Sequence, residues 1–137
     1  MGNTISINDG LKVYDIVNQD GEFVGQFKIN PSDAGMVERY RHGIQRLEES
    51  LKKYSDIEDT MNSFIEMQDI VVKELEYIVG NDSVSVFFKV MGAFSPQGDQ
   101  LYYEKVLDII IGIIDEENKK IKQAMEKRIE KYAKKYQ

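Results

Sequence analysis

The spacing of apolar residues after Pro31 is the feature that most constrains the fold of this chain. From residue 36 to residue 54, apolar side chains recur every three or four positions, with charged residues between them. Such spacing places the apolar side chains along one side of a helix, so it predicts an amphipathic helix of about 20 residues. Ser55 and Asp56 restart the pattern, and a second helix is expected over residues 57–79, before a stop at Gly80. The two helices are expected to form an antiparallel hairpin.

The same spacing returns in the last third of the chain and predicts one long helix that begins near residues 99–101. Its apolar seam consists of Val106, Ile109, Ile110, Ile113, Ile114, Ile121, Met125, Ile129, Tyr132 and Tyr136. The seam is wide at its start and narrow at its end, so the last turns are expected to project from the body. Before this helix, residues 83–94 predict a short helix and residues 95–99 predict a loop.

The first thirty residues are typical of strands, because side chains alternate at residues 4–8 and 23–29 and residues 11–17 form an extended run. Strands are expected at residues 4–8, 11–17 and 23–29, with glycine-containing turns between them. Pro31 then ends the last strand, and Ser32 or Asp33 can cap the helix that follows. The sequence therefore predicts an α+β, mainly α fold: an N-terminal three-stranded antiparallel β-meander packed on a bundle of about four helices, with a long basic C-terminal helix.

A chain of 137 residues is long enough for one core, and we treat residues 1–137 as a single domain. It comprises a β-meander (1–30), a helical body (31–117) and a basic C-terminal helix (118–137). The formal net charge is -6, but the last segment carries eight Lys or Arg against Glu126 and Glu130, which leaves -12 on the rest. The sequence thus joins a basic segment to an acidic body.

Residues for catalysis or metal binding are scarce. The chain has no cysteine and only one histidine, which excludes thiolate sites and two-histidine metal sites. Its acidic clusters fit no calcium-binding loop and are typical of solvated helix faces. We therefore expect no enzymatic activity, no catalytic or metal-binding residue and no cofactor. Neither a membrane-spanning apolar run nor a signal peptide is present, so a cytoplasmic location without a membrane partner is expected.

Two stretches, residues 84–94 and 109–114, contain more apolar residues than one buried helix face uses. Extra apolar surface is typical of a groove or patch that binds another helix or a second copy of the chain. A central helix of a small bundle, surrounded on most sides, has the same composition. The predicted contact residues are Phe87, Phe88, Met91, Phe94, Ile109, Ile110 and Ile113.

Three motifs give the chain a resemblance to a known family. The segment Phe27-Lys28-Ile29-Asn30-Pro31-Ser32-Asp33 follows the meander, Arg39-Tyr40 lies in the next helix, and Lys131-Tyr132-Ala133-Lys134-Lys135-Tyr136 closes the chain. In this order they resemble the small tail assembly chaperones of tailed phages and prophages of Gram-positive bacteria. The resemblance extends from end to end and includes no catalytic group.

The resemblance implies a non-enzymatic function in the host bacterial cytoplasm. Such chaperones bind the long helical tape measure protein, keep its apolar helices soluble and self-associate along it. They are displaced when tail tube subunits polymerise around it. The implied partners are therefore the tape measure protein, further copies of the chain in a homo-oligomer and, transiently, the tail tube protein.

Two other functions stay open. A structural phage tail or head-tail connector protein would use the same apolar surface but would remain in purified particles. A small nucleic-acid-binding regulator would contact phosphates through the basic C-terminal helix, although no base-reading motif accompanies it and the acidic body opposes attraction of polyanions. The basic residues in question are Lys119, Lys120, Lys122, Lys127, Arg128, Lys131, Lys134 and Lys135.

Overall fold

The computed structural model describes residues 2–54 and 60–135. In chain order the elements are β1 (Lys12–Val17), β2 (Phe23–Ile29), α1 (Met36–Tyr54), α2 (Thr60–Val79), the 3-10 helix η1 (Asp82–Lys89), β3 (Pro96–Gln97), β4 (Gln100–Leu101) and α3 (Tyr102–Lys135). The described part is mainly helical, as predicted, with four helices beside small antiparallel sheets. The predicted helix restart at Ser55 and Asp56 and the last seam residue, Tyr136, lie outside the described residues.

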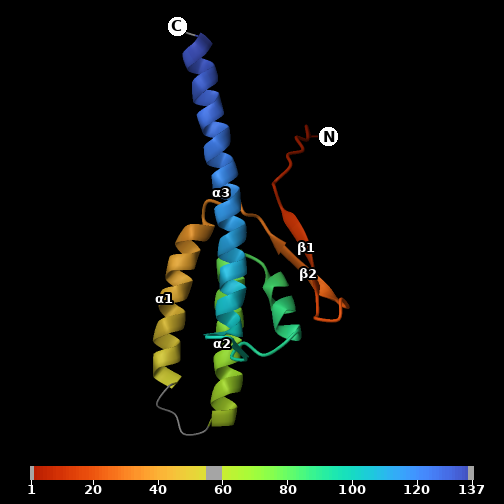
Figure 1. Ribbon diagram of the computed structural model, residues 1–137, viewed down its shortest axis with the longest axis vertical. Helices are drawn as coiled ribbons and strands as arrows, with labels where there is room; N and C mark the ends of the chain where they lie inside the picture. The colour runs from red at the N-terminus through yellow and green to blue at the C-terminus, as the bar shows by residue number, and fades with distance from the viewer. Residues whose placement is uncertain (1, 55–59, 136–137) are drawn as a thin grey trace.

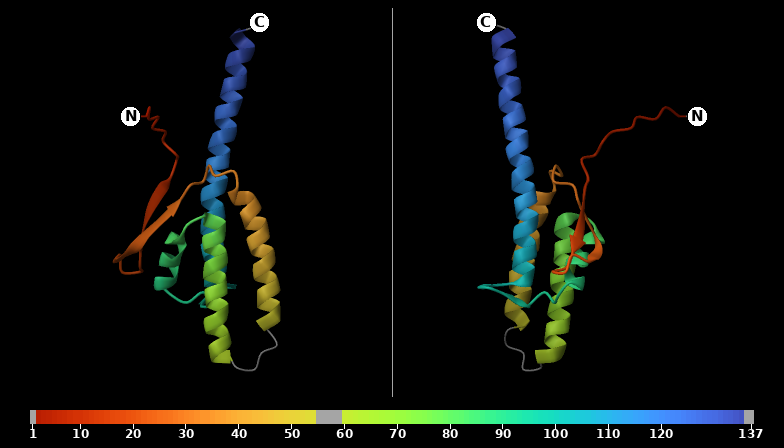
Figure 2. Two further views of the ribbon diagram at one scale, coloured as in Figure 1. Left: turned by 180° about the vertical axis from the view of Figure 1, so that it is seen from behind. Right: turned by 45° about the vertical axis from the view of Figure 1, so that its right-hand side comes forward.

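The helices stand side by side. Helices α1 and α2 form the predicted antiparallel hairpin, and α3 runs along them (Figure 1; Figure 2). On the other side of α2, η1 lies between this helix and strand β2. The small sheet thus covers one flank of the helical body, and the lower part of α3 covers another.

Strands β1 and β2 pair as an antiparallel hairpin, with Tyr14 opposite Phe27. Their turn is closed by Asn18, whose side-chain oxygen accepts hydrogen bonds from the N–H groups of Asp20 and Glu22. On the helical side, Gly25 permits close contact with η1, because a Cβ atom at this position would lie 2.4 Å from a methyl group of Val86. The sheet therefore packs on η1 more closely than any larger residue would allow.

The predicted third strand over residues 4–8 is not formed, so the sheet has two strands and the three-stranded meander is not confirmed. Asn8 and Asp9 instead use their side chains to accept hydrogen bonds from the backbone two residues ahead, each at 3.0 Å. These local bonds replace the hairpin pairing that a third strand would need. Ile5 and Ile7 consequently stay exposed, and the segment leads away from the body (Figure 1).

The change from strand to helix occurs at the predicted place and is held by Arg39. Asp33 Oδ1 accepts a hydrogen bond from the N–H of Gly35 (2.9 Å), one residue before α1 begins. Arg39 donates to Asp33 Oδ2 (2.6 Å) and to the carbonyl oxygens of Tyr77 and Ile78 near the end of α2. The hydrogen bond from Arg39, with that from Gly35, lowers the pKa of Asp33. Arg39 therefore joins the start of α1 to the end of α2.

The short helix predicted at residues 83–94 is formed as η1, and the predicted loop at 95–99 contains strand β3, which pairs with β4 just after the loop in a small hairpin. The Phe27 and Phe87 rings meet edge to face, with centroids 5.0 Å apart, and the Tyr102 hydroxyl donates to the Phe87 carbonyl oxygen (2.7 Å). These contacts place η1 inside the single core. The largest fully buried side chains of that core are Phe27, Ile29, Met36, Val71, Leu75, Ile78, Val84, Val106 and Ile110.

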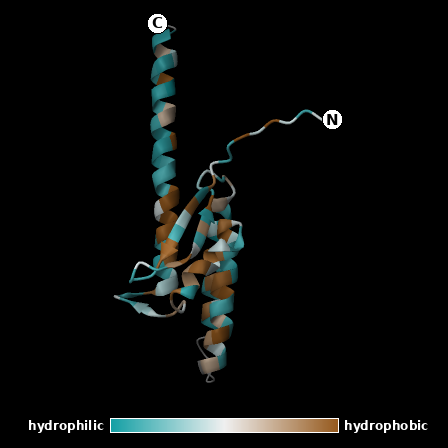
Figure 3. Ribbon diagram, turned by 90° about the vertical axis from the view of Figure 1, so that its right-hand side faces the viewer, coloured by the Kyte–Doolittle hydropathy of each residue, from teal (hydrophilic) through white to brown (hydrophobic). Residues whose placement is uncertain are grey.

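Helix α3 has two halves with different surroundings. Up to Glu117 it lies along the body and buries Tyr102, Val106, Leu107 and Ile110. Over residues 118–135 every residue is exposed, and the helix extends beyond the body as a rod (Figure 1; Figure 3). We call residues 118–135 the arm.

Candidate interaction surface

The predicted contact residues on η1 and the segment after it serve mainly as packing. Phe88 and Phe94 are half-buried, and their rings meet Tyr102 and Tyr103 at centroid distances of 5.8 and 5.7 Å. The structure thus brings this segment against the start of α3. The four predicted residues here are the buried Phe87 and the half-buried Phe88, Met91 and Phe94.

The three predicted contact residues on α3 point in different directions. Ile110 is fully buried, Ile113 is half-buried against the core, and Ile109 is exposed. A contact role does not fit Phe87 and Ile110, because neither side chain presents a surface to a partner. Much of the apolar excess in the two stretches is therefore used by the core, as in a central bundle helix.

The apolar side chains of the arm were not among the predicted contact residues, yet they are the ones that the fold leaves uncovered. Steps of four, four and three residues place them along one stripe of the helix. Together with Ala124 and Arg128 they line a shallow apolar hollow. We call them the arm stripe: Ile121, Met125, Ile129 and Tyr132, which are 41, 59, 65 and 55% exposed. The seam in the sequence contained this signal, but only the fold shows where packing on the seam ends.

Basic side chains border the arm stripe. At about 100° per residue, Lys131 lies on one side of it and Lys122 on the other, Lys120 and Lys127 lie farther round the helix, and Arg128 lines the hollow. Of the arm's two carboxylates, Glu126 lies one turn from Lys122 on the second side of the stripe, and Glu130 lies near the back of the helix. The arm therefore presents an apolar stripe with basic side chains on both sides.

Glu117 anchors α3 at the point where the helix leaves the body. Its carboxylate accepts hydrogen bonds from Lys12 Nζ on β1 and from Ser32 Oγ, both at 3.3 Å. The hydrogen bond to Glu117 raises the pKa of Lys12. The sheet and the strand-helix connection thus both hold the last half-buried residue of α3, and the arm begins directly after it.

A second exposed apolar group lies at the start of α2. Met61, Phe64 and Ile65 are all more than half exposed, and the Phe64 ring meets Phe94 at 6.1 Å. We call these three side chains the α2 patch. The patch and the arm lie at opposite ends of the molecule (Figure 1).

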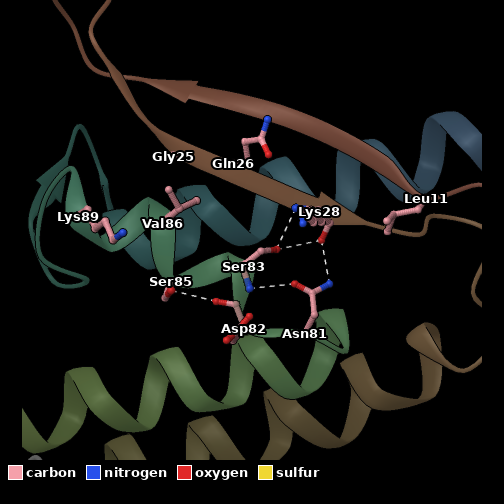
Figure 4. Close-up of a pocket in the computed structure, with 10 residues that line it drawn as sticks. All are labelled: Leu11, Gly25, Gln26, Lys28, Asn81, Asp82, Ser83, Ser85, Val86 and Lys89. Atoms are coloured by element: carbon pink, nitrogen blue, oxygen red, sulfur yellow. Dashed lines mark hydrogen bonds between the residues drawn. The ribbon is translucent and has the colours of Figure 1, made fainter.

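A hollow of about 620 Å³ between β2 and η1 has a structural explanation (Figure 4). Ser83 Oγ donates to the carbonyl oxygen of Lys28 and accepts from its N–H, at 3.1 and 2.9 Å. Asn81 Nδ2 donates to the same carbonyl oxygen at 3.0 Å. These bonds join η1 to the edge of β2, and we assign the hollow that role.

The described residues contain no group of three or more His, Cys, Asp or Glu side chains placed to hold a metal ion. His42 is exposed and lies 3.8 Å from the carboxylate of Glu38, one turn earlier on α1. Within the described part of the chain, the helices are too short or too polar to cross a membrane.

Comparison of the chain with protein-family models, with curated proteins and with solved structures finds no match.

Proposed function

We propose that the chain is a tail assembly chaperone of a tailed phage or prophage, which binds the tape measure protein in the host bacterial cytoplasm and keeps it soluble during tail assembly. The observation that carries the proposal is the arm, a helix that leaves the body and exposes an apolar stripe. Such a stripe is unfavourable in water and favours pairing with another helix. The apolar helices of a tape measure protein would supply that partner.

The proposal includes self-association along the tape measure protein. The arm and the α2 patch lie at opposite ends of the molecule, so one copy can contact the tape measure helix through the arm and a neighbouring copy through the α2 patch (Figure 1). If the α2 patch meets a different surface of the neighbouring copy, the contact is head-to-tail and produces an open row of subunits. An open row suits a long rod-shaped partner.

A structural tail or head-tail connector protein is the alternative that shares this surface. It differs in fate, because a structural protein remains in purified particles and a chaperone does not. The exposed basic side chains of the arm favour a third function, nucleic-acid binding. In that case phosphate contacts, and not the arm stripe, would carry the affinity.

The test is co-expression of the full chain with the tape measure protein of the same genome. We expect the chain to increase the soluble amount of that protein and to co-purify with it. Changing Ile121, Met125 and Ile129 together to Gln should abolish both effects. The matched control changes Ile5 and Ile7 to Gln, since these are also exposed apolar residues but lie outside the arm.

Three outcomes would contradict the proposal. The tape measure protein could be equally soluble with and without the chain. Mass spectrometry could find the chain in purified particles, which would favour the structural alternative. Finally, nucleic acid alone could co-purify and be lost at about 0.5 M salt, which would favour the regulator.

A further inference from the structure

The arm stripe has the dimensions of a site for one helix. From Ile121 to Tyr132 it extends over about three helical turns, or roughly 17 Å. Its hollow is open along the helix and lined by apolar atoms together with the stem of Arg128. A partner helix of similar length can lie along it with its own apolar side chains between those of the arm.

Charge excludes a second arm as the natural occupant. Over residues 118–135, eight basic side chains and two carboxylates give the arm a net charge of +6. Pairing two arms would bring two such segments to helix-helix distance, where like charges destabilise the pair. Arg128 would in addition have to leave water beside basic neighbours.

The same charges are complementary to an acidic helix. Lys122 and Lys131 border the stripe on its two sides, where the flanking residues of a paired helix would be placed, and Lys120 and Lys127 add positive charge farther round the helix. Arg128 presents a planar guanidinium that can bind a carboxylate through two hydrogen bonds. Because the stem of Arg128 lines the hollow and its guanidinium lies at the exposed edge, Arg128 also selects against a partner that is basic at this point.

We propose that the arm binds an amphipathic helix whose apolar stripe is flanked by Glu or Asp. The partner's apolar side chains contact Ile121, Met125 and Tyr132, and one of its carboxylates pairs with Arg128. This inference rests on the proposed function for the origin of the helix, which would be a tape measure segment with this pattern. The preference for acidic flanking residues, which we call the charge rule, applies to any helix that the arm binds.

The experiment measures binding of two fluorescent synthetic peptides to the full chain by anisotropy. Both peptides have three heptads with Leu at the a and d positions, and they differ only in carrying Glu or Lys at the e and g positions. At low salt we expect the Glu peptide to bind at least tenfold more tightly than the Lys peptide, because several attractive charge pairs in one complex are replaced by repulsive pairs in the other. The difference should shrink at about 0.5 M salt, because the flanking charges are exposed and screened.

Charge reversal at one position assigns the site. Arg128→Glu should weaken binding of the Glu peptide at least tenfold and should strengthen binding of the Lys peptide. The matched control is Arg41→Glu, which makes the same change at an exposed position on α1 and should leave both affinities unchanged. Circular dichroism of each variant checks that the helices are retained.

Several results would overturn the inference. The two peptides could bind equally, or Arg128→Glu could have no more effect than Arg41→Glu. The chain could bind neither peptide and instead bind phosphatidylserine vesicles, which would make the arm a membrane-surface helix. Light scattering could also show that the arm is already covered in a homodimer, with Arg128→Glu strengthening the dimer.

The outcomes separate this inference from the proposed function. If the Glu peptide binds through Arg128 but the tape measure protein is not kept soluble, the phage function fails and the charge rule for the arm stands. If the tape measure protein is kept soluble equally well by Arg128→Glu, the function stands and the charge rule is wrong.

Discussion

The two halves of α3 have similar apolar spacing and opposite surroundings. In the first half Val106 and Ile110 are fully buried, whereas in the arm Ile121 and Ile129 are exposed. Both halves belong to one uninterrupted helix, Tyr102–Lys135. Periodicity therefore predicts which side of the helix is apolar, but burial requires a neighbouring element, and neighbours end at Glu117.

The largest expected effect is a loss of stability on truncating a buried isoleucine, compared with the same change at an exposed isoleucine of the arm. Ile110→Ala should lower the free energy of unfolding by about 2–5 kcal/mol, because it removes fully buried atoms and leaves a cavity. Ile129→Ala should change it by less than about 0.5 kcal/mol, since the side chain is exposed. Urea unfolding followed by circular dichroism measures both. Equal losses would mean that the arm packs on the body in solution.

The second prediction concerns the contribution of Arg39 to the stability of the body. Arg39→Met should cost about 2 kcal/mol of stability, because it removes charge-assisted hydrogen bonds to Asp33 and to two carbonyl groups at the end of α2. Arg41→Met, two positions away at an exposed site, should have little effect. Thermal unfolding of both variants gives the comparison. A similar loss in both would show that the Arg39 contacts contribute nothing specific.

The pH dependence of stability should be a property of the body. The pKa of Asp33 is lowered by Arg39, so the folded state binds this proton less readily than the unfolded state. The stabilisation is therefore complete at neutral pH and is lost as the pH falls through the usual value of 3.8 and then the lowered one. Asp33→Asn should lower the melting temperature at pH 7 and flatten its decline toward acid. The arm variant Glu126→Gln should keep the wild-type dependence of melting temperature on pH. If that dependence also flattens in Glu126→Gln, the pH effect is not specific to the body.

The smallest expected effect concerns helix propensity. Gly112 lies in the packed half but faces open space, since a Cβ atom there would meet nothing within 4 Å. Gly112→Ala should raise stability by about 0.5–1 kcal/mol. Ala133→Gly in the exposed arm should instead reduce helix content without changing the unfolding midpoint of the body. Chemical denaturation and hydrogen exchange along the arm distinguish the two. A midpoint shift for Ala133→Gly would show that the arm unfolds together with the body.

The sequence predicts the helices and strands β1 and β2 correctly because the signals for these elements are local. Apolar spacing predicts α1, α2 and α3, and Pro31 with Asp33 marks the change from strand to helix. The third strand could not be predicted correctly, because alternation at residues 4–8 indicates a strand only where another strand is free to pair. The side-chain hydrogen bonds of Asn8 and Asp9 direct the chain elsewhere.

The candidate site was harder to predict than the fold. The excess of apolar residues at 84–94 and 109–114 was visible, but it did not reveal that Phe87 and Ile110 belong to the core. Conversely, Ile129 continues the apolar seam of the helix, and the sequence does not show that it is exposed. Its exposure follows from the fold, because the body ends before this residue. Contact residues depend on what other elements cover, and that is a property of the three-dimensional arrangement.

By itself, the sequence determined the helical periods, the turn chemistry, the absence of cysteine and the separation of a basic end from an acidic body. Only the tertiary structure decided which apolar side chains are buried. Helix formation depends on residues three and four positions apart, whereas burial depends on residues brought together from distant parts of the chain. The Glu117 contacts to Lys12 and Ser32 show this, because they join segments far apart in sequence at the place where the body ends and the arm begins.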